Sequence, residues 1–166
     1  MHQSVIYPAE KKELYPLLAL QLEALISSCS RPLPALCNCA ALLWEALPDI
    51  NWAGFYLLRD ETLYLGPFQG KIACTVIPVG RGVCGTAAEE KRIQLVPDVH
   101  AFPGHIACDS ASNSEIVLPL IAGDKLVGVM DIDSPLLNRF TQEDSDGLAA
   151  LCRILCEQLN WTEGLL

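Results

Sequence analysis

Basic residues are scarce in this chain of 166 residues, where 11 Lys and Arg stand against 20 Asp and Glu. The resulting formal net charge of −9 argues against binding to nucleic acid or to an anionic membrane, because both need a basic surface. The acidic balance favours a soluble protein and leaves room for a cationic or zwitterionic small ligand. We therefore expect no nucleic-acid partner and no membrane partner.

Long apolar runs are also missing, since none approaches the roughly 18 residues of a membrane span. The N-terminal stretch MHQSVIYPAEKKELYPLLAL lacks the basic segment followed by an apolar segment that a signal peptide needs. We therefore expect a cytoplasmic protein. Thiols stay reduced in that compartment, so the eight cysteines do not predict a structural disulfide framework.

The sequence gives little indication of a metal site, because no Cys-x-x-Cys pair occurs. Cys37 and Cys39 are too close together in the chain for most structural zinc sites. His105 and Cys108, three residues apart, make only a weak ligand pattern in a loop. We expect no metal site, and a metal-binding regulatory domain is kept as an alternative that metal analysis would test.

Hydrophobic periodicity divides the chain into helices and strands. Helical spacing predicts helices over residues 9–29, 30–47, 84–91 and 140–159, the last capped by Thr141 with Asp144. Apolar and aromatic runs predict strands over residues 50–58, 62–68, 72–79, 92–98, 115–122 and 126–133, the last two joined by a Gly-Asp turn.

Helices at both ends and a run of hairpins between them predict an α+β fold with a central, mainly antiparallel sheet. The chain length suits a single domain. We place that domain over residues 1–166, with N-terminal helices over 1–48 and the sheet, a loop and the C-terminal helix over 49–158. The loop of residues 99–113 has no periodicity, and loops longer than about 12 residues are usually functional or disordered.

The stretch VGRGVCGTAAEEKR, residues 79–92, matches the G-x-G-x-x-G pattern of dinucleotide-binding proteins. Such a site needs a parallel βαβ unit with the glycines in its first turn. Here the glycines lie mid-chain between predicted hairpins, so we interpret them as a tight turn from a strand into a helix. NADPH is therefore not expected to bind.

Four segments carry a resemblance to a known family: NWAGFYL, LGPFQGKIACTVIPVGRGVCGTA, VPDVHAFPGHIACDSASNSEIV and GVMDIDS. Over roughly residues 50 to 158 the chain resembles GAF domains and, among them, the free methionine-(R)-sulfoxide reductases. The resemblance implies reduction of free L-methionine-(R)-sulfoxide to methionine by cysteine thiols. GAF domains in general are small-molecule sensors, so a non-catalytic sensor of a metabolite or of redox state is the alternative.

The resemblance implies different roles for three cysteines. Cys108 in GHIACDS matches the attacking thiol, Cys74 in KIACTV matches the main resolving thiol, and Cys84 in GVCGT matches an auxiliary one. The residues alone leave this order open, because a place near a helix N-terminus lowers a thiol pKa and would nominate Cys84 as the attacker. The sulfenic acid left by the attack would condense with a resolving thiol to a disulfide.

The resemblance further implies that thioredoxin reopens this disulfide by thiol exchange, with NADPH supplying the electrons through thioredoxin reductase. No cofactor is expected to be bound by the chain itself. A homodimer is expected by analogy with other GAF domains.

Two aspartates, Asp131 and Asp133, end a predicted strand with the same parity, so their side chains should share a face. Glu115 begins the paired strand and could lie opposite them. Crowded carboxyl groups raise at least one pKa, which makes a proton donor near neutral pH, and they would attract an ammonium group. The resemblance assigns substrate binding and proton supply to these residues, and we take Asp133 as the acid; solvated strand ends are the alternative.

Trp52 and Tyr56 also share parity, and aromatic walls suit the methyl group and sulfur of such a substrate. Core packing is an equal alternative for both, and Phe55 on the opposite face is expected in the core. Ser114 and backbone amides of the Cys108 loop are candidates to hold the substrate carboxylate.

The other five cysteines lie outside these motifs. Cys152 and Cys156 are four residues apart beside leucines of the last predicted helix and are most simply core residues. Cys29, Cys37 and Cys39 belong to the N-terminal helices, and the sequence assigns them no role.

Overall fold

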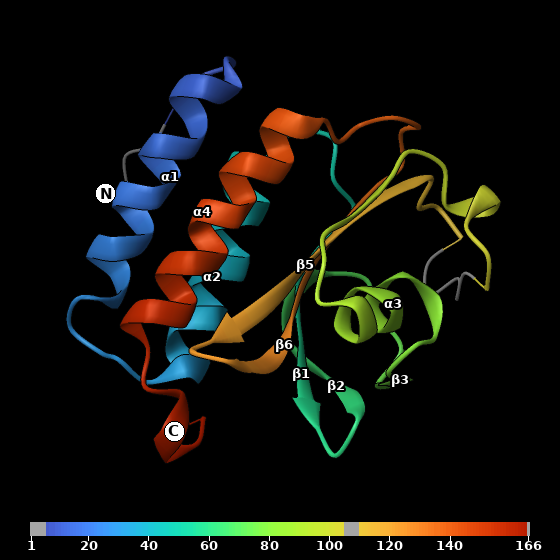
Figure 1. Ribbon diagram of the computed structural model, residues 1–166. Helices are drawn as coiled ribbons and strands as arrows, with labels where there is room; N and C mark the ends of the chain where they lie inside the picture. The colour runs from blue at the N-terminus through green and yellow to red at the C-terminus, as the bar shows by residue number, and fades with distance from the viewer. Residues whose placement is uncertain (1–5, 105–109, 166) are drawn as a thin grey trace.

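Leucines at helical spacing build three helices that cover one face of a sheet (Figure 1). In the computed structural model, which describes residues 6–104 and 110–165, these helices are α1 (Lys11–Ile26), α2 (Pro32–Ala46) and α4 (Gln142–Gln158). The predicted capping box is confirmed, since the Thr141 N–H donates to Asp144 Oδ2 over 2.7 Å. One further helix, α3 (Gly82–Glu90), covers the other face.

The sheet has six strands in the order β3-β2-β1-β6-β5-β4, and each neighbouring pair is antiparallel. This confirms the predicted α+β class and the central antiparallel sheet. The strands are β1 (Trp52–Arg59), β2 (Thr62–Gly70), β3 (Val76–Pro78), β4 (Gln94–Val96), β5 (Ser114–Ala122) and β6 (Lys125–Ser134). The β5–β6 hairpin carries the candidate carboxylates Glu115, Asp131 and Asp133.

Successive side chains of the central strands point to opposite faces of the sheet, and each face builds its own hydrophobic core. Phe55 and Ile132 pack in the larger core between the sheet and α1, α2 and α4, as predicted for Phe55. Tyr56 and Val117 pack in the smaller core between the sheet and α3. Trp52, Tyr56 and Cys84, three of the nominated residues, belong to this smaller core.

Two strands are shorter than the sequence predicts. β3 covers only Val76–Pro78 of the expected 72–79, and β4 only Gln94–Val96 of the expected 92–98. In the segment before β3, backbone carbonyl groups accept hydrogen bonds from side chains of β1. Trp52 Nε1 donates to Lys71 O, and the Tyr56 hydroxyl donates to Cys74 O. This segment therefore leaves the sheet and packs against side chains from the first part of β1.

The glycine loop is a tight strand-to-helix turn, as its position between hairpins suggested. The Gly80 N–H donates to Gly85 O over 2.8 Å, and a Cβ atom on Gly85 would lie 2.5 Å from Pro78 O. The helix begins at Gly82, two residues earlier than predicted, and ends at Glu90; Lys91 caps it in the left-handed conformation, with φ of 52°.

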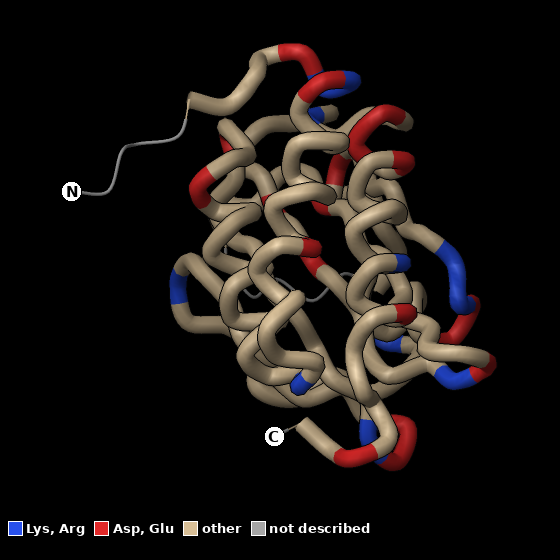
Figure 2. The backbone as a smooth tube through the Cα atoms, turned by 90° about the vertical axis from the view of Figure 1, so that its left-hand side faces the viewer, with Lys and Arg blue, Asp and Glu red and all other residues tan. Residues whose placement is uncertain are grey.

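Within the described ranges, no helix combines the length and the apolar character needed to cross a membrane. Figure 2 shows charged residues of both signs dispersed along the helices and the turns between strands.

Candidate active site

Asp131 and Asp133 lie on the face of β6 that looks toward α3, while Ile132 between them is buried in the larger core. Glu115 of β5 pairs directly with Asp133, and Val117 pairs with Asp131. The predicted shared face of the two aspartates and the position of Glu115 across from them are confirmed.

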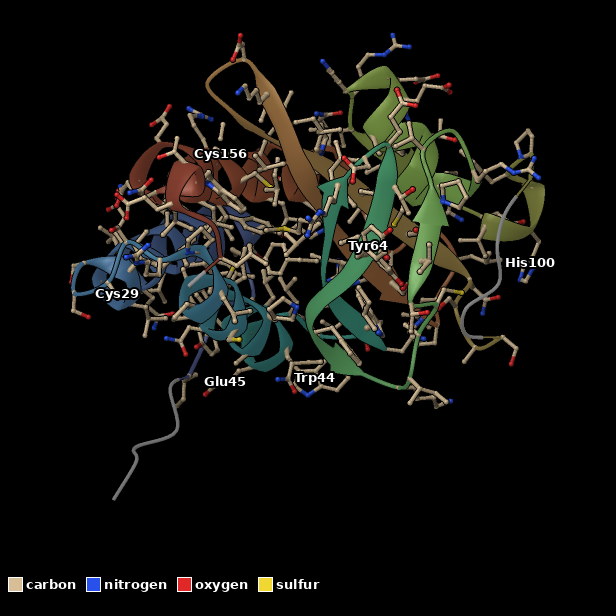
Figure 3. The ribbon with its side chains drawn as sticks, turned by 90° about the horizontal axis from the view of Figure 1, so that it is seen from below. Cys29, Trp44, Glu45, Tyr64, His100 and Cys156 are labelled. Atoms are coloured by element: carbon tan, nitrogen blue, oxygen red, sulfur yellow. The ribbon has the colours of Figure 1, made fainter. Side chains whose placement is uncertain are left out.

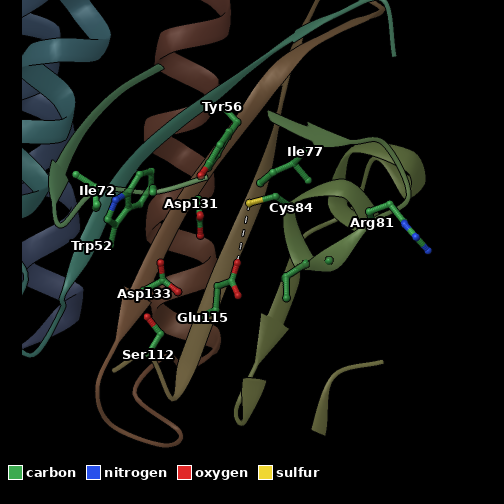
Figure 4. Close-up of a pocket in the computed structure, with 13 residues that line it drawn as sticks. Trp52, Tyr56, Ile72, Ile77, Arg81, Cys84, Ser112, Glu115, Asp131 and Asp133 are labelled. Carbon is green, nitrogen blue, oxygen red and sulfur yellow. Dashed lines mark hydrogen bonds between the residues drawn. The ribbon is translucent and has the colours of Figure 1, made fainter. Parts of the chain in front are cut away.

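These three carboxyl groups line a pocket with the start of α3, the segment before β3 and the first part of β1 (Figure 4). Trp52 and Tyr56 form its aromatic wall, and Cys84 enters it from α3. The structure thus brings together six of the nine residues that the sequence nominated.

The aromatic wall is rigidly held. The rings of Trp52 and Tyr56 stack with centroids 5.9 Å apart, and Phe68 stacks on Trp52 at 5.2 Å. The Tyr56 hydroxyl donates to the backbone carbonyl of Cys74 over 3.0 Å. One aromatic side chain therefore links the wall of the pocket to the segment that carries Cys74.

The carboxyl groups are crowded and withdrawn from water. Burial, followed by the charges of Asp131 and Asp133, raises the pKa of Glu115 well above its usual range. Burial also raises the pKa of Asp131 to about 6, although hydrogen bonds with Cys84 and Glu115 oppose the shift. Protons can therefore be held in this pocket near neutral pH, where ordinary carboxyl groups have lost them.

Asp131 also carries an unused hydrogen-bond acceptor. Its Oδ1 atom is buried and has no hydrogen-bond partner among the described residues, and the whole residue is only 6% exposed. A buried carboxylate oxygen without a partner is costly. This oxygen is therefore well suited to accept a hydrogen bond from a bound cationic group.

The structure corrects the expected acidity of Cys84. Its place in the first turn of α3 suggested a lowered pKa, but burial, followed by the charges of Asp131 and Glu115, raises the pKa well above its usual value. The Cys84 thiol donates a long hydrogen bond to Glu115 Oε1 at 4.0 Å. Loss of solvation and neighbouring negative charge outweigh the helix N-terminus here.

Of the other two nominated thiols, the structure describes Cys74 but not Cys108. Cys74 is half-buried and disulfide-bonded. Cys108 lies outside the described residues, as does His105 of the weak metal pattern. The six other described cysteines are free.

Ser114 does not reach the pocket. It precedes Glu115 on β5 and therefore points to the opposite face, where its hydroxyl donates to Leu136 O over 2.6 Å. The pocket instead contains Ser112, which the sequence reasoning missed. Asn51 Nδ2 donates to Ser112 Oγ over 3.0 Å, and Ser112 is only 4% exposed.

The remaining free cysteines lie away from the pocket. Figure 3 shows Cys29 and Cys156 on the helical side of the molecule, far from His100 near the start of the long loop. Cys39 and Cys152 are buried in the larger core, as the helical spacing predicted for Cys152. Cys37 is exposed.

Comparisons with known proteins agree with the fold. A family model described as GAF domain matches residues 39–155. The free methionine-R-sulfoxide reductase of Escherichia coli is 56% identical over 92% of this chain and 93% of its own. That of Saccharomyces cerevisiae is 45% identical over 87% of this chain and 85% of its own.

Among solved structures, the free methionine-R-sulfoxide reductase from Neisseria meningitidis in complex with its substrate superposes with a TM-score of 0.88. It is 42% identical to this chain and covers 93% of each chain.

Proposed function

The chain belongs to the free methionine-R-sulfoxide reductases, oxidoreductases of the GAF domain family, and from this membership we propose a mechanism for its own residues. The substrate is free L-methionine-(R)-sulfoxide and the product is L-methionine. The observation that carries the proposal is the pocket in which Asp131, Asp133 and Glu115 face an aromatic wall.

The carboxyl groups receive the ammonium group of the free amino acid. Asp131 Oδ1 is the first candidate, because it is buried and accepts no hydrogen bond from the described residues. A peptide-bound methionine lacks this ammonium group, so the same pocket disfavours it. Trp52 and Tyr56 contact the methyl group and sulfur of the substrate, since sulfur packs favourably against aromatic rings.

Reduction begins when the Cys108 thiolate attacks the substrate sulfur. The sulfur–oxygen bond breaks, the oxygen passes to Cys108 as a sulfenic acid, and methionine leaves with two electrons more than the sulfoxide. Asp133 supplies a proton to the departing oxygen. Its partner across the β5–β6 pair is Glu115, whose raised pKa lets this pair of carboxyl groups hold a proton near neutral pH. The raised pKa of Cys84 supports Cys108 rather than Cys84 as the attacker.

Cys74 then resolves the sulfenic acid. Its thiol attacks the Cys108 sulfur, a disulfide forms and water leaves. The disulfide carried by Cys74, with all six other described cysteines free, supports this pairing. Cys84 acts as an auxiliary thiol that exchanges with the pair.

Thioredoxin reduces the disulfide through thiol exchange and is itself recharged from NADPH by its reductase. We propose no bound cofactor for the chain. A cytoplasmic location, expected from the sequence pattern, and a homodimeric assembly, by analogy with other GAF domains, complete the proposal.

Mass spectrometry of the reduced protein after addition of free methionine sulfoxide, without a reductant, tests the proposal. We expect one equivalent of methionine and a Cys74–Cys108 disulfide. In Cys74→Ser the equivalent of methionine should still form while thioredoxin-driven cycling fails, and the matched control Cys37→Ser should behave as wild type. Absence of thiol loss would contradict the proposal and favour the sensor function.

A further inference from the structure

Three donors from three different elements converge at the floor of the pocket. Cys84 Sγ from α3, a Glu115 oxygen from β5 and an Asp131 oxygen from β6 all lie within 4.8 Å of one another. Figure 4 shows the three side chains directed toward a common point, with Asp133 beside them.

The distance between the sulfur and one carboxylate oxygen is close to that in a cation site. Zinc–sulfur and zinc–oxygen distances of about 2.3 and 2.0 Å place a sulfur and an oxygen about 3.5 Å apart in a tetrahedral site. The distance from Cys84 Sγ to Glu115 Oε1 is 4.0 Å. A movement of about 0.5 Å, within the reach of a side-chain rotation, would close this gap.

Asp131 supplies a second, independent observation. Its buried Oδ1 atom faces the pocket without a hydrogen-bond partner among the described residues, so one acceptor is already desolvated and unused. A thiol together with two carboxyl groups suits zinc or cadmium. Magnesium and calcium prefer oxygen ligands alone and in larger number.

We propose that Cys84, Glu115 and Asp131 form a site for a thiophilic divalent cation of the zinc and cadmium class, and that its occupancy inhibits the enzyme. On binding, the Cys84 thiol proton passes to solvent and the sulfur becomes a thiolate ligand. The cation fills the position that the substrate ammonium needs. This inhibitory consequence rests on the proposed function, whereas the site itself does not.

Titration with Cd²⁺ tests the site without any catalysis. The protein is used with its Cys74 disulfide intact, so that Cys84 is the free thiol among the described residues of the pocket. We expect a thiolate-to-cadmium charge-transfer absorption that saturates at one equivalent. With free Cd²⁺ held constant by a chelator buffer, free methionine sulfoxide should reverse the signal.

Three variants decide the ligands. Cys84→Ser should abolish the absorption, and Asp131→Asn should weaken binding by more than the roughly 10- to 100-fold that loss of an outer partner costs. Cys37→Ser removes an exposed thiol that does not line the pocket. It is the matched control and should bind Cd²⁺ as the wild type does. Because Asp131→Asn keeps the side-chain shape, it tests the site even if Cys84→Ser does not fold.

The outcomes separate the two proposals. A wild-type protein without the absorption, or a Cys84→Ser variant that keeps it, would overturn the metal site and leave the reductase mechanism standing. A saturable absorption in a protein that reduces no methionine sulfoxide would overturn the mechanism and leave the metal site standing.

Discussion

Removing the Tyr56 hydroxyl tests whether β1 positions the proposed resolving cysteine. Tyr56→Phe deletes the 3.0 Å hydrogen bond to the Cys74 carbonyl and keeps the ring that stacks on Trp52. The side chain is only 1% exposed, and loss of such a bond costs about 0.5–1.5 kcal/mol. If this energy holds Cys74 in place for attack on the sulfenic acid, disulfide formation should slow by up to about tenfold.

Rapid-quench mass spectrometry separates the two chemical steps. Methionine release in the first turnover should match wild type in Tyr56→Phe, while the sulfenic acid, trapped with a nucleophilic probe, should accumulate before the disulfide forms.

Tyr15→Phe is the matched control, because it also removes a buried tyrosine hydroxyl, one that donates to Asp144 Oδ1 over 2.7 Å on the helical side of the sheet. Each variant should lower the melting temperature by about 2–4 °C, given a chain of this size. Only Tyr56→Phe should affect disulfide formation. An unchanged rate in Tyr56→Phe, or an equal slowing in Tyr15→Phe, would refute the positioning role.

Three further predictions concern stability and thiol reactivity. Burial alone would raise the Asp144 pKa, but hydrogen bonds from Lys11 and other donors hold this pKa below its usual value. The ionised Asp144 carboxylate therefore stabilises the fold at pH values above the unfolded pKa of about 3.9, and this stabilisation is lost as pH falls. Asp144→Asn should cost about 3–5 kcal/mol in urea unfolding at pH 7, and a smaller loss at pH 3; an equal loss at both would contradict this. Gly85→Ala should cost about 1–3 kcal/mol, because the new Cβ meets Pro78 O; an unchanged melting curve would argue against that contact. Peptide mapping after iodoacetamide treatment at pH 7 should find Cys84 labelled far more slowly than exposed Cys37, and comparable labelling would contradict the raised Cys84 pKa.

The carboxylate cluster could be predicted from the sequence because β-strand geometry has a fixed period of two. Asp131 and Asp133 had to share a face. Glu115 lies opposite Asp133 because a register shift between Leu120 and Ile121 moves the pairing one residue beyond the register that the turn sets, and the turn alone does not predict this shift. The same period of two excludes Ser114 from the pocket, because a residue next to Glu115 on a strand must point to the other face of the sheet. Parity alone was sufficient to correct that prediction.

Properties that depend on tertiary packing could not be predicted in this way. The pKa of Cys84 follows from burial beside two carboxyl groups that lie 31 and 47 positions away in the chain, and a local helix-terminus argument does not include them. The convergence of Cys84, Glu115 and Asp131 has no spacing signature for the same reason. Ser112 precedes its strand, where no periodicity indicates the direction of a side chain.

The proposed mechanism depends on attack by Cys108 on the sulfur of a free amino acid held in this acidic, aromatic pocket. Epimer-resolved chromatography of free and peptide-bound methionine sulfoxide, incubated with the protein and a thioredoxin system, tests it most directly. We expect consumption of the free (R) epimer, little loss of the (S) epimer or of the peptide, and no turnover in Cys108→Ser. Equal consumption of both epimers, or full activity in Cys108→Ser, would contradict it.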